Sequence, residues 1–176
     1  MLDLRPILSA LSARYQRVLT GLDVAFDNAT ASQTLRDIRG GVWMTVVSNA
    51  EAASKVGAAL PEGTVHMIGE DGTLPFDECP FEVVVLNGEA ISQPLVREIH
   101  RVLKPAGFLF FTVNEENRGK RNSTLSKLYN MFLKNGFDLV SLIRPPWWKF
   151  GVGGRTLTVC ARSKAWKEHK SLGGFK

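Results

Sequence analysis

The chain has 176 residues, and its 44% hydrophobic and 22% charged residues are typical of one folded domain rather than of a disordered or fibrous protein. Its formal net charge is +5, and +4 of this excess comes from residues 162–176, which hold five basic side chains and one acidic one, Glu168. No apolar run approaches the roughly 20 residues of a membrane-spanning helix, and the charged N-terminal segment does not resemble a secretory signal. We predict one domain over 1–163 and a basic, flexible tail over 164–176, a solvated segment or a nucleic-acid contact.

Apolar periodicity and turn residues predict an alternation of helices and strands along the chain. The expected helices cover residues 6–16, 31–38, 50–59, 95–104 and 124–135. The expected strands cover residues 17–21, 42–47, 64–68, 81–87, 108–113, 137–143 and 155–161. Ser48 or Asn49 is expected to cap one helix, Pro94 suits the first turn of another, and Gly136 suits a helix end. This alternation predicts an α/β fold around a mainly parallel sheet.

The cysteines and histidines give no sign of a disulfide framework, a metal site or a nucleophile paired with a base. Cys79 and Cys160 are the only cysteines, and neither belongs to a C-x-x-C pair, which favours a reducing, cytoplasmic compartment. His66, His100 and His169 are not spaced as metal ligands. We therefore predict no metal site and assign no catalytic residue.

Residues 64–113 carry the most specific pattern in the chain. A strand is followed by an acidic turn, by L-P-F at 74–76, by a second strand and by R-E-I-H-R-V-L-K-P-A-G at 97–107. This stretch resembles the central region of class I S-adenosylmethionine-dependent methyltransferases. The resemblance implies a doubly wound, mainly parallel seven-stranded sheet with helices on both faces and an antiparallel last strand.

The cofactor motif of that family has only partial counterparts here. The family has a glycine-rich turn after the first strand, and we assign residues 19–26 to that turn, where Gly21 is the one glycine and Asp23 could mimic the acidic group. The bulky side chains of Leu22, Val24 and Phe26 would then fill space that the cofactor needs. This arrangement argues against cofactor binding.

Two further positions of that motif can be compared. The family's carboxylate for the ribose hydroxyls has no counterpart in Val46-Val47-Ser48-Asn49, at the end of the second strand. A third position, beside the adenine, corresponds to Glu70 or Asp71, although an acidic pair in a surface turn is a common feature in itself. If S-adenosylmethionine is bound at all, the resemblance thus assigns it Gly21, Asp23, Glu70 and Asp71.

A second resemblance covers about residues 81–157, and its distinctive part is Pro146-Trp147-Trp148-Lys149-Phe150-Gly151. This segment is similar to a stretch in the anamorsin family, whose N-terminal domain is methyltransferase-like and lacks the cofactor motif. The resemblance implies a role in cytosolic iron–sulfur protein assembly, with electrons supplied by a diflavin reductase. The family's cysteine-rich segments have no counterpart in this sequence, and a basic tail stands where an acidic linker would begin.

The segment before the last strand also suggests a contact surface on its own. Two prolines keep the backbone extended, so Trp147 and Trp148 point in different directions, and Lys149 adds a charge. These three residues suit a protein contact or the stacking of a base, whereas packing of both tryptophans over the sheet edge remains the structural alternative.

Two functions remain open from the sequence. The first is a non-catalytic, methyltransferase-like interaction domain of anamorsin type, without a cofactor of its own and with a diflavin reductase as partner. The alternative is an active S-adenosylmethionine-dependent methyltransferase with an eroded glycine motif, acting on RNA through the basic tail.

Overall fold

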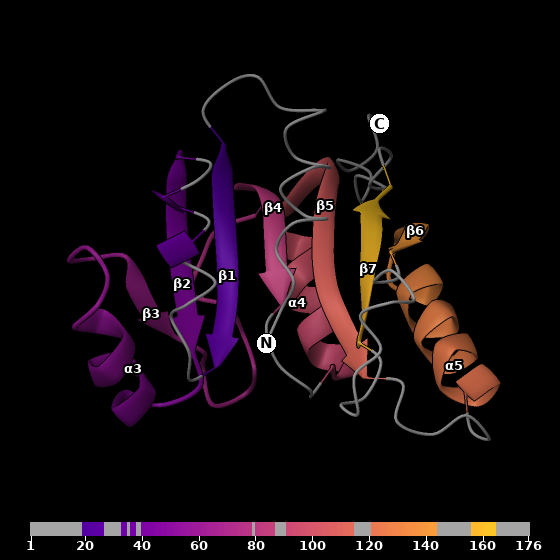
Figure 1. Ribbon diagram of the computed structural model, residues 1–176, viewed down its shortest axis with the longest axis horizontal. Helices are drawn as coiled ribbons and strands as arrows, with labels where there is room; N and C mark the ends of the chain where they lie inside the picture. Colours follow the sequence, from indigo (N-terminus) through magenta and orange to yellow (C-terminus); the bar gives the residue numbers. More distant parts are fainter. Residues whose placement is uncertain are drawn as a thin grey trace, which may run out of the picture.

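The computed structural model describes residues 19–26, 33–34, 36–37, 40–78, 80–86, 91–114, 121–143 and 156–164, and all statements below concern these residues. Within them the chain alternates strands and helices in the order drawn in Figure 1. The strands are β1 (Thr20–Phe26), β2 (Val42–Val47), β3 (Val65–Met67), β4 (Phe81–Leu86), β5 (Leu103–Asn114), β6 (Phe137–Ile143) and β7 (Thr156–Ser163). The helices are α3 (Ala50–Gly57), α4 (Gln93–Val102) and α5 (Arg121–Lys134).

The strands form one seven-stranded sheet in the order β3-β2-β1-β4-β5-β7-β6. Adjacent strands from β3 to β5 are parallel, and β7 runs antiparallel to both of its neighbours, β5 and β6. The predicted fold class, a mainly parallel seven-stranded sheet with an antiparallel last strand, is confirmed.

Helices cover both faces of this sheet because side chains on successive strand residues point to opposite faces. In β2, Val46 joins the large core cluster that includes residues of α4 and α5. Its neighbour Val47 instead packs with Ala52 and Val56 of α3. Figure 1 shows α4 behind the central strands.

The middle of the sheet follows the predicted bounds closely. All six residues of β4 are buried, as an uninterrupted apolar run between two helical layers requires. Strand β5 begins five residues before its predicted start at 108, because Leu103 already pairs with Phe81 of β4. The register between β4 and β5 shifts between this pair and the next one, Val83 with Phe108. The helix that precedes β5 therefore ends at Val102.

The predicted helix caps are also present. The Asn49 side chain accepts a hydrogen bond of 2.8 Å from the Ala52 N–H and thereby caps α3. Pro94 lies in the first turn of α4, after the cap residue Ser92. Gly136 adopts a φ of 84° two residues after the end of α5, where a left-handed residue ends the helix.

The predicted position of the first strand is wrong. The prediction was 17–21, with a turn over 19–26, but β1 spans Thr20–Phe26 and is the central strand of the parallel part. Residues 21–24 pair with β2 on one side and with β4 on the other. These two ladders hold the segment extended although it contains a glycine and an aspartate, residue types that are rare in strands.

No helix among the described residues is long and apolar enough to cross a membrane.

Candidate functional site

The sheet topology marks one edge as the candidate site. The chain passes outward from β1 to β2 and β3 and then returns to β4, on the other side of β1. In open α/β sheets, ligands bind outside the carboxyl ends of the strands where the strand order reverses in this way. The candidate site therefore lies at the carboxyl ends of β1, β2, β3 and β4.

Gly21 lies near the start of β1, far along the strand from this edge, and the structure gives it a packing role. A Cβ atom at Gly21 would overlap the six-membered ring of Trp43. The Trp43 side chain is fully buried, and its indole N–H donates to the Gly40 carbonyl at 2.9 Å. The glycine therefore makes room for this ring on the neighbouring strand.

Asp23 is fully buried in the middle of β1, in register with Thr45 of β2 and Val85 of β4. Its charge acts on Arg36, whose guanidinium donates to the Trp43 carbonyl. Burial lowers the pKa of Arg36, and the carboxylate of Asp23 counteracts this effect in part. A buried carboxylate requires such a partner, because an uncompensated charge inside a protein is strongly destabilising.

The bulky residues that were expected to obstruct the cofactor do not lie in a turn. Leu22 and Val24 are fully buried inside β1 and belong to the core cluster beneath α4 and α5. Strand β1 ends at Phe26, and residues 27–32, which follow it, lie outside the described residues. Their sequence, Asp-Asn-Ala-Thr-Ala-Ser, contains no glycine.

At the carboxyl end of β2 the polar groups are neutral. Ser48 and Asn49 follow Val47 directly, and the Asn49 amide donates to the Ser48 hydroxyl at 3.3 Å. The carbonyl oxygen of the same Asn49 side chain is engaged with the first turn of α3. This strand end therefore offers hydroxyl and amide groups where the family that the sequence resembles has a carboxylate.

The structure separates the roles of Glu70 and Asp71 after β3. The Asp71 carboxylate accepts hydrogen bonds from the backbone N–H of Thr73 at 3.0 Å and from its hydroxyl at 2.6 Å. The hydroxyl bond is the main reason that the pKa of Asp71 is lowered. Asp71 thus holds the turn together, whereas the neighbouring Glu70 is exposed at the carboxyl edge.

The L-P-F loop between β3 and β4 is held by two charged residues of α4. Arg101 donates to the carbonyls of Phe76 at 2.7 Å and Leu74 at 2.9 Å. Glu98 accepts from the Leu74 N–H at 3.0 Å and forms an ion pair of 2.7 Å with Arg101. Hydrogen bonding from Arg101 is the largest cause of the lowered pKa of Glu98.

This clamp was missed from the sequence, although its parts belong to the two motifs that carried the resemblance. The spacing of Glu98 and Arg101, three residues apart on a helix, is the signal that predicts an ion pair. Nothing in the sequence pattern indicates that both would turn toward backbone groups of the L-P-F loop.

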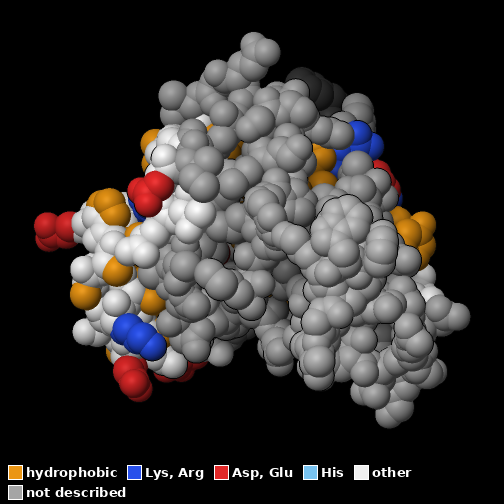
Figure 2. Space-filling model, in the orientation of Figure 1, with side chains coloured by type: hydrophobic (Ala, Val, Ile, Leu, Met, Phe, Trp, Pro, Cys, Tyr) orange, Lys and Arg blue, Asp and Glu red, His pale blue; other side chains and the backbone are white. Residues whose placement is uncertain are grey.

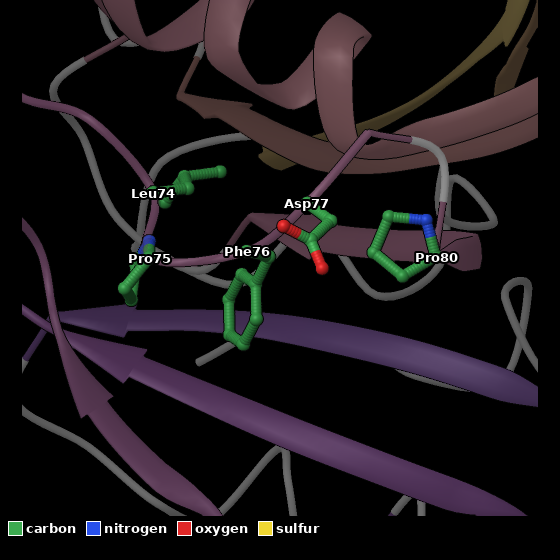
Figure 3. Close-up of a pocket in the computed structure, with 5 residues that line it drawn as sticks. All are labelled: Leu74, Pro75, Phe76, Asp77 and Pro80. Carbon is green, nitrogen blue, oxygen red and sulfur yellow. The ribbon is translucent and has the colours of Figure 1, made fainter.

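The loop also borders an open hollow of about 450 Å³, lined by Leu74, Pro75, Phe76, Asp77 and Pro80. Figure 3 shows the Phe76 ring directed toward the strands beneath the loop, and the Asp77 carboxylate between Phe76 and Pro80. The Phe76 ring makes edge-to-face contacts with His66 and Phe81, at centroid distances of 5.1 and 4.9 Å. The loop leads from the carboxyl end of β3 back to the start of β4, and the hollow lies along this return.

The predicted contact residues Trp147, Trp148 and Lys149 lie outside the described residues, and so do Cys79 and His169, to which no site role was assigned. The tail after Lys164 lies outside them as well. In the described ranges, no three His, Cys, Asp or Glu side chains are grouped so that they could hold a metal ion.

Comparisons with known proteins identify the fold. No family model and no curated protein matches the chain. Among solved structures, a SAM-dependent methyltransferase of Methanosarcina mazei has 16% identity and a TM-score of 0.71, over 93% of this chain and 99% of that one. A SAM-dependent methyltransferase of Aquifex aeolicus has 13% identity and a TM-score of 0.67, over 89% of this chain and 88% of that one.

A third similar structure contains ligands. It is the 1,6-didemethyltoxoflavin-N1-methyltransferase of Burkholderia thailandensis with bound 1,6-didemethyltoxoflavin and S-adenosylhomocysteine. It has 17% identity and a TM-score of 0.65, over 92% of this chain and 78% of that one. The strand order, the antiparallel last strand and these likenesses over nearly the whole chain agree: the protein has the class I methyltransferase fold.

Proposed function

We propose that the protein binds S-adenosylmethionine at the carboxyl edge of β1 to β4 and is a methyltransferase. The observation that carries the proposal is the reversal of strand order between β1 and β4, with Glu70 exposed at the end of β3. The similar structures named above support it, because they are described as SAM-dependent methyltransferases and one holds S-adenosylhomocysteine.

The side chains at this edge fit the cofactor's polar groups. The Glu70 carboxylate can accept a hydrogen bond from an adenine amino group, a charge-assisted contact. Ser48 and Asn49 can exchange hydrogen bonds with ribose hydroxyls as neutral groups. Of the three residues expected to obstruct the cofactor, Leu22 and Val24 are packed in the core, and the side chain of Phe26 lies outside the described part of the structure.

S-adenosylmethionine would supply an electrophilic methyl group, so the protein's task is to bind and orient two reactants. Holding a nucleophile in line with a bound electrophile removes much of the entropic part of the barrier. Arg101 and Glu98 hold the L-P-F loop in place through hydrogen bonds to its backbone. The turn at Glu70 directly precedes this loop in the chain, so one of its ends is anchored. A preorganised edge of this kind loses little conformational entropy when a ligand binds.

Calorimetric titration with S-adenosylmethionine and S-adenosylhomocysteine tests the proposal. We expect micromolar binding by the full chain, and about 10-fold weaker binding by Glu70→Gln, which corresponds to the loss of one charge-assisted hydrogen bond. Glu62→Gln is the matched control, because Glu62 is also an exposed glutamate but lies before β3, at the opposite edge of the sheet. Its affinity should equal that of the unchanged protein.

Lack of binding at millimolar ligand would contradict the proposal. It would favour the interaction domain of anamorsin type, whose support is the sequence segment 146–151. Under that alternative the purified chain should capture a diflavin reductase, and Trp147→Ala or Trp148→Ala should weaken capture without unfolding the domain.

A further inference from the structure

One surface of the molecule carries exposed basic side chains without the acidic neighbours that usually balance them. Lys127 and Lys134 lie on α5, and Arg97 lies on α4. A fourth basic residue, Lys164, directly follows β7. All four are exposed, and in the described part of the chain none of them has a carboxylate partner. We call these four residues the α5 basic surface.

Hydrogen bonds bring three of the four residues together around the end of α5. The Arg97 guanidinium donates to the Asn135 side chain at 3.3 Å. The backbone N–H of Lys164 donates to the Gly136 carbonyl at 3.0 Å. Lys134 directly precedes this Asn135–Gly136 turn. Arg97, Lys134 and Lys164 are therefore anchored to one turn although they come from three separate elements.

Lys127 extends the surface along the helix. Lys127, Asn130 and Lys134 are spaced i, i+3, i+7, so they form one exposed stripe about 10 Å long. Tyr129 is 46% exposed, but it projects from α5 about 100–160° around the helix axis from these three residues. Helix α5 contains no acidic residue. The stripe thus combines positive charge with an amide, and an accessible aromatic ring lies on another exposed side of the same helix.

The acidic residues near the α5 basic surface do not neutralise its positive charge. Asp138 is the carboxylate closest in sequence to the Asn135–Gly136 turn, and it is in register with a basic residue, Arg162, on β7. Glu98 is paired with Arg101, and Glu82 lies 3.8 Å from Lys104. On the face drawn in Figure 2, the described charged side chains are of both signs.

We propose that the α5 basic surface binds single-stranded nucleic acid, with RNA as the probe of choice. Phosphates are attracted to rows of lysine and arginine, and an exposed aromatic ring supplies a stacking platform for any base. The residues after Lys164 continue the same charge, since the sequence adds Lys167, Lys170 and Lys176 against Glu168. The binding does not depend on the proposed methyl transfer and needs no cofactor.

Fluorescence anisotropy with a labelled 12-nucleotide oligouridylate tests this proposal on the full chain. Four phosphate contacts predict that log K falls with log salt with a slope of about −3. Lys127→Glu/Lys134→Glu should lower affinity at least 10-fold at low salt and reduce the slope by about 1 to 1.5. Tyr129→Ala should weaken binding about 5-fold or more through lost stacking.

Lys55→Glu is the matched control for Lys134→Glu, because each lysine is exposed in the last turn of its helix and α3 lies on the opposite face of the sheet. It should leave the affinity within about 2-fold of the unchanged protein. The proposal fails if the full chain shows no saturable binding at 50 mM salt, or if Lys55→Glu weakens binding as much as Lys134→Glu. It also fails if polyglutamate competes as well as RNA, which would indicate an acidic protein partner. Circular dichroism verifies that every variant is folded.

Discussion

Gly21 and Asp23 show how residue types that look like a turn can belong to a central strand. The glycine is required because the Trp43 ring occupies the place of its missing side chain, and the aspartate is tolerated because Arg36 lies near it. Both reasons involve residues that are distant in the sequence. A local pattern therefore predicts a turn here, while packing between strands determines the structure.

The role assigned to Gly21 predicts that Gly21→Ala is destabilising. The added methyl group must displace a fully buried tryptophan, and such overpacking costs about 1–3 kcal/mol in the free energy of unfolding. Urea unfolding followed by tryptophan fluorescence measures this cost.

Gly57→Ala is the control for that measurement. Gly57 ends α3, and a Cβ atom there would have no heavy atom within 4 Å. In a helix, alanine in place of glycine is expected to stabilise by about 0.5–1 kcal/mol. Equal effects of the two substitutions would contradict the packing role of Gly21.

At the scale of elements, the sequence predicts best the strands that form short apolar runs bounded by turn residues. The bounds of β2 and β6 agree with prediction, and β4 differs by one residue at its end. These strands can be predicted from their local sequence, because a run of apolar residues must be buried wherever it packs. The candidate site was less predictable: the acidic turn was identified, but the clamp between α4 and the L-P-F loop depends on contacts between separate elements.

The clamp predicts a dependence of stability on pH. The pKa of Glu98 is lowered in the folded protein, so its contribution is present above the unfolded pKa of about 4.3 and is lost as pH falls through the folded pKa. We expect the difference in melting temperature between the unchanged protein and Glu98→Gln to be largest near pH 7 and to shrink below about pH 4.

The pH series has its own control. Asp71→Asn removes a second carboxylate of the described residues with a lowered pKa, but Asp71 is exposed and supports its own turn. Its effect on melting temperature should be small at every pH. A constant difference between Glu98→Gln and the unchanged protein over the whole range would show that charge on Glu98 does not hold the loop.

At the scale of the molecule, the sheet separates the two proposed sites. Glu70 follows β3 at one end of the strand order, and α5 leads into β6 at the other end. Seven strands at about 4.8 Å spacing place these ends nearly 30 Å apart. The fold thus allows a cofactor edge and a nucleic-acid surface to act on the same chain without sharing a residue.

This separation predicts additive effects when both sites are changed together, because distant substitutions without common partners combine independently. Glu70→Gln should weaken S-adenosylmethionine binding and leave oligouridylate affinity within about 2-fold, and Lys127→Glu/Lys134→Glu should do the reverse. The triple variant should lose cofactor affinity by as much as Glu70→Gln alone. It should lose oligouridylate affinity by as much as Lys127→Glu/Lys134→Glu alone. A loss of cofactor affinity caused by the α5 substitutions alone would contradict independence and would place the nucleic acid in contact with the cofactor edge.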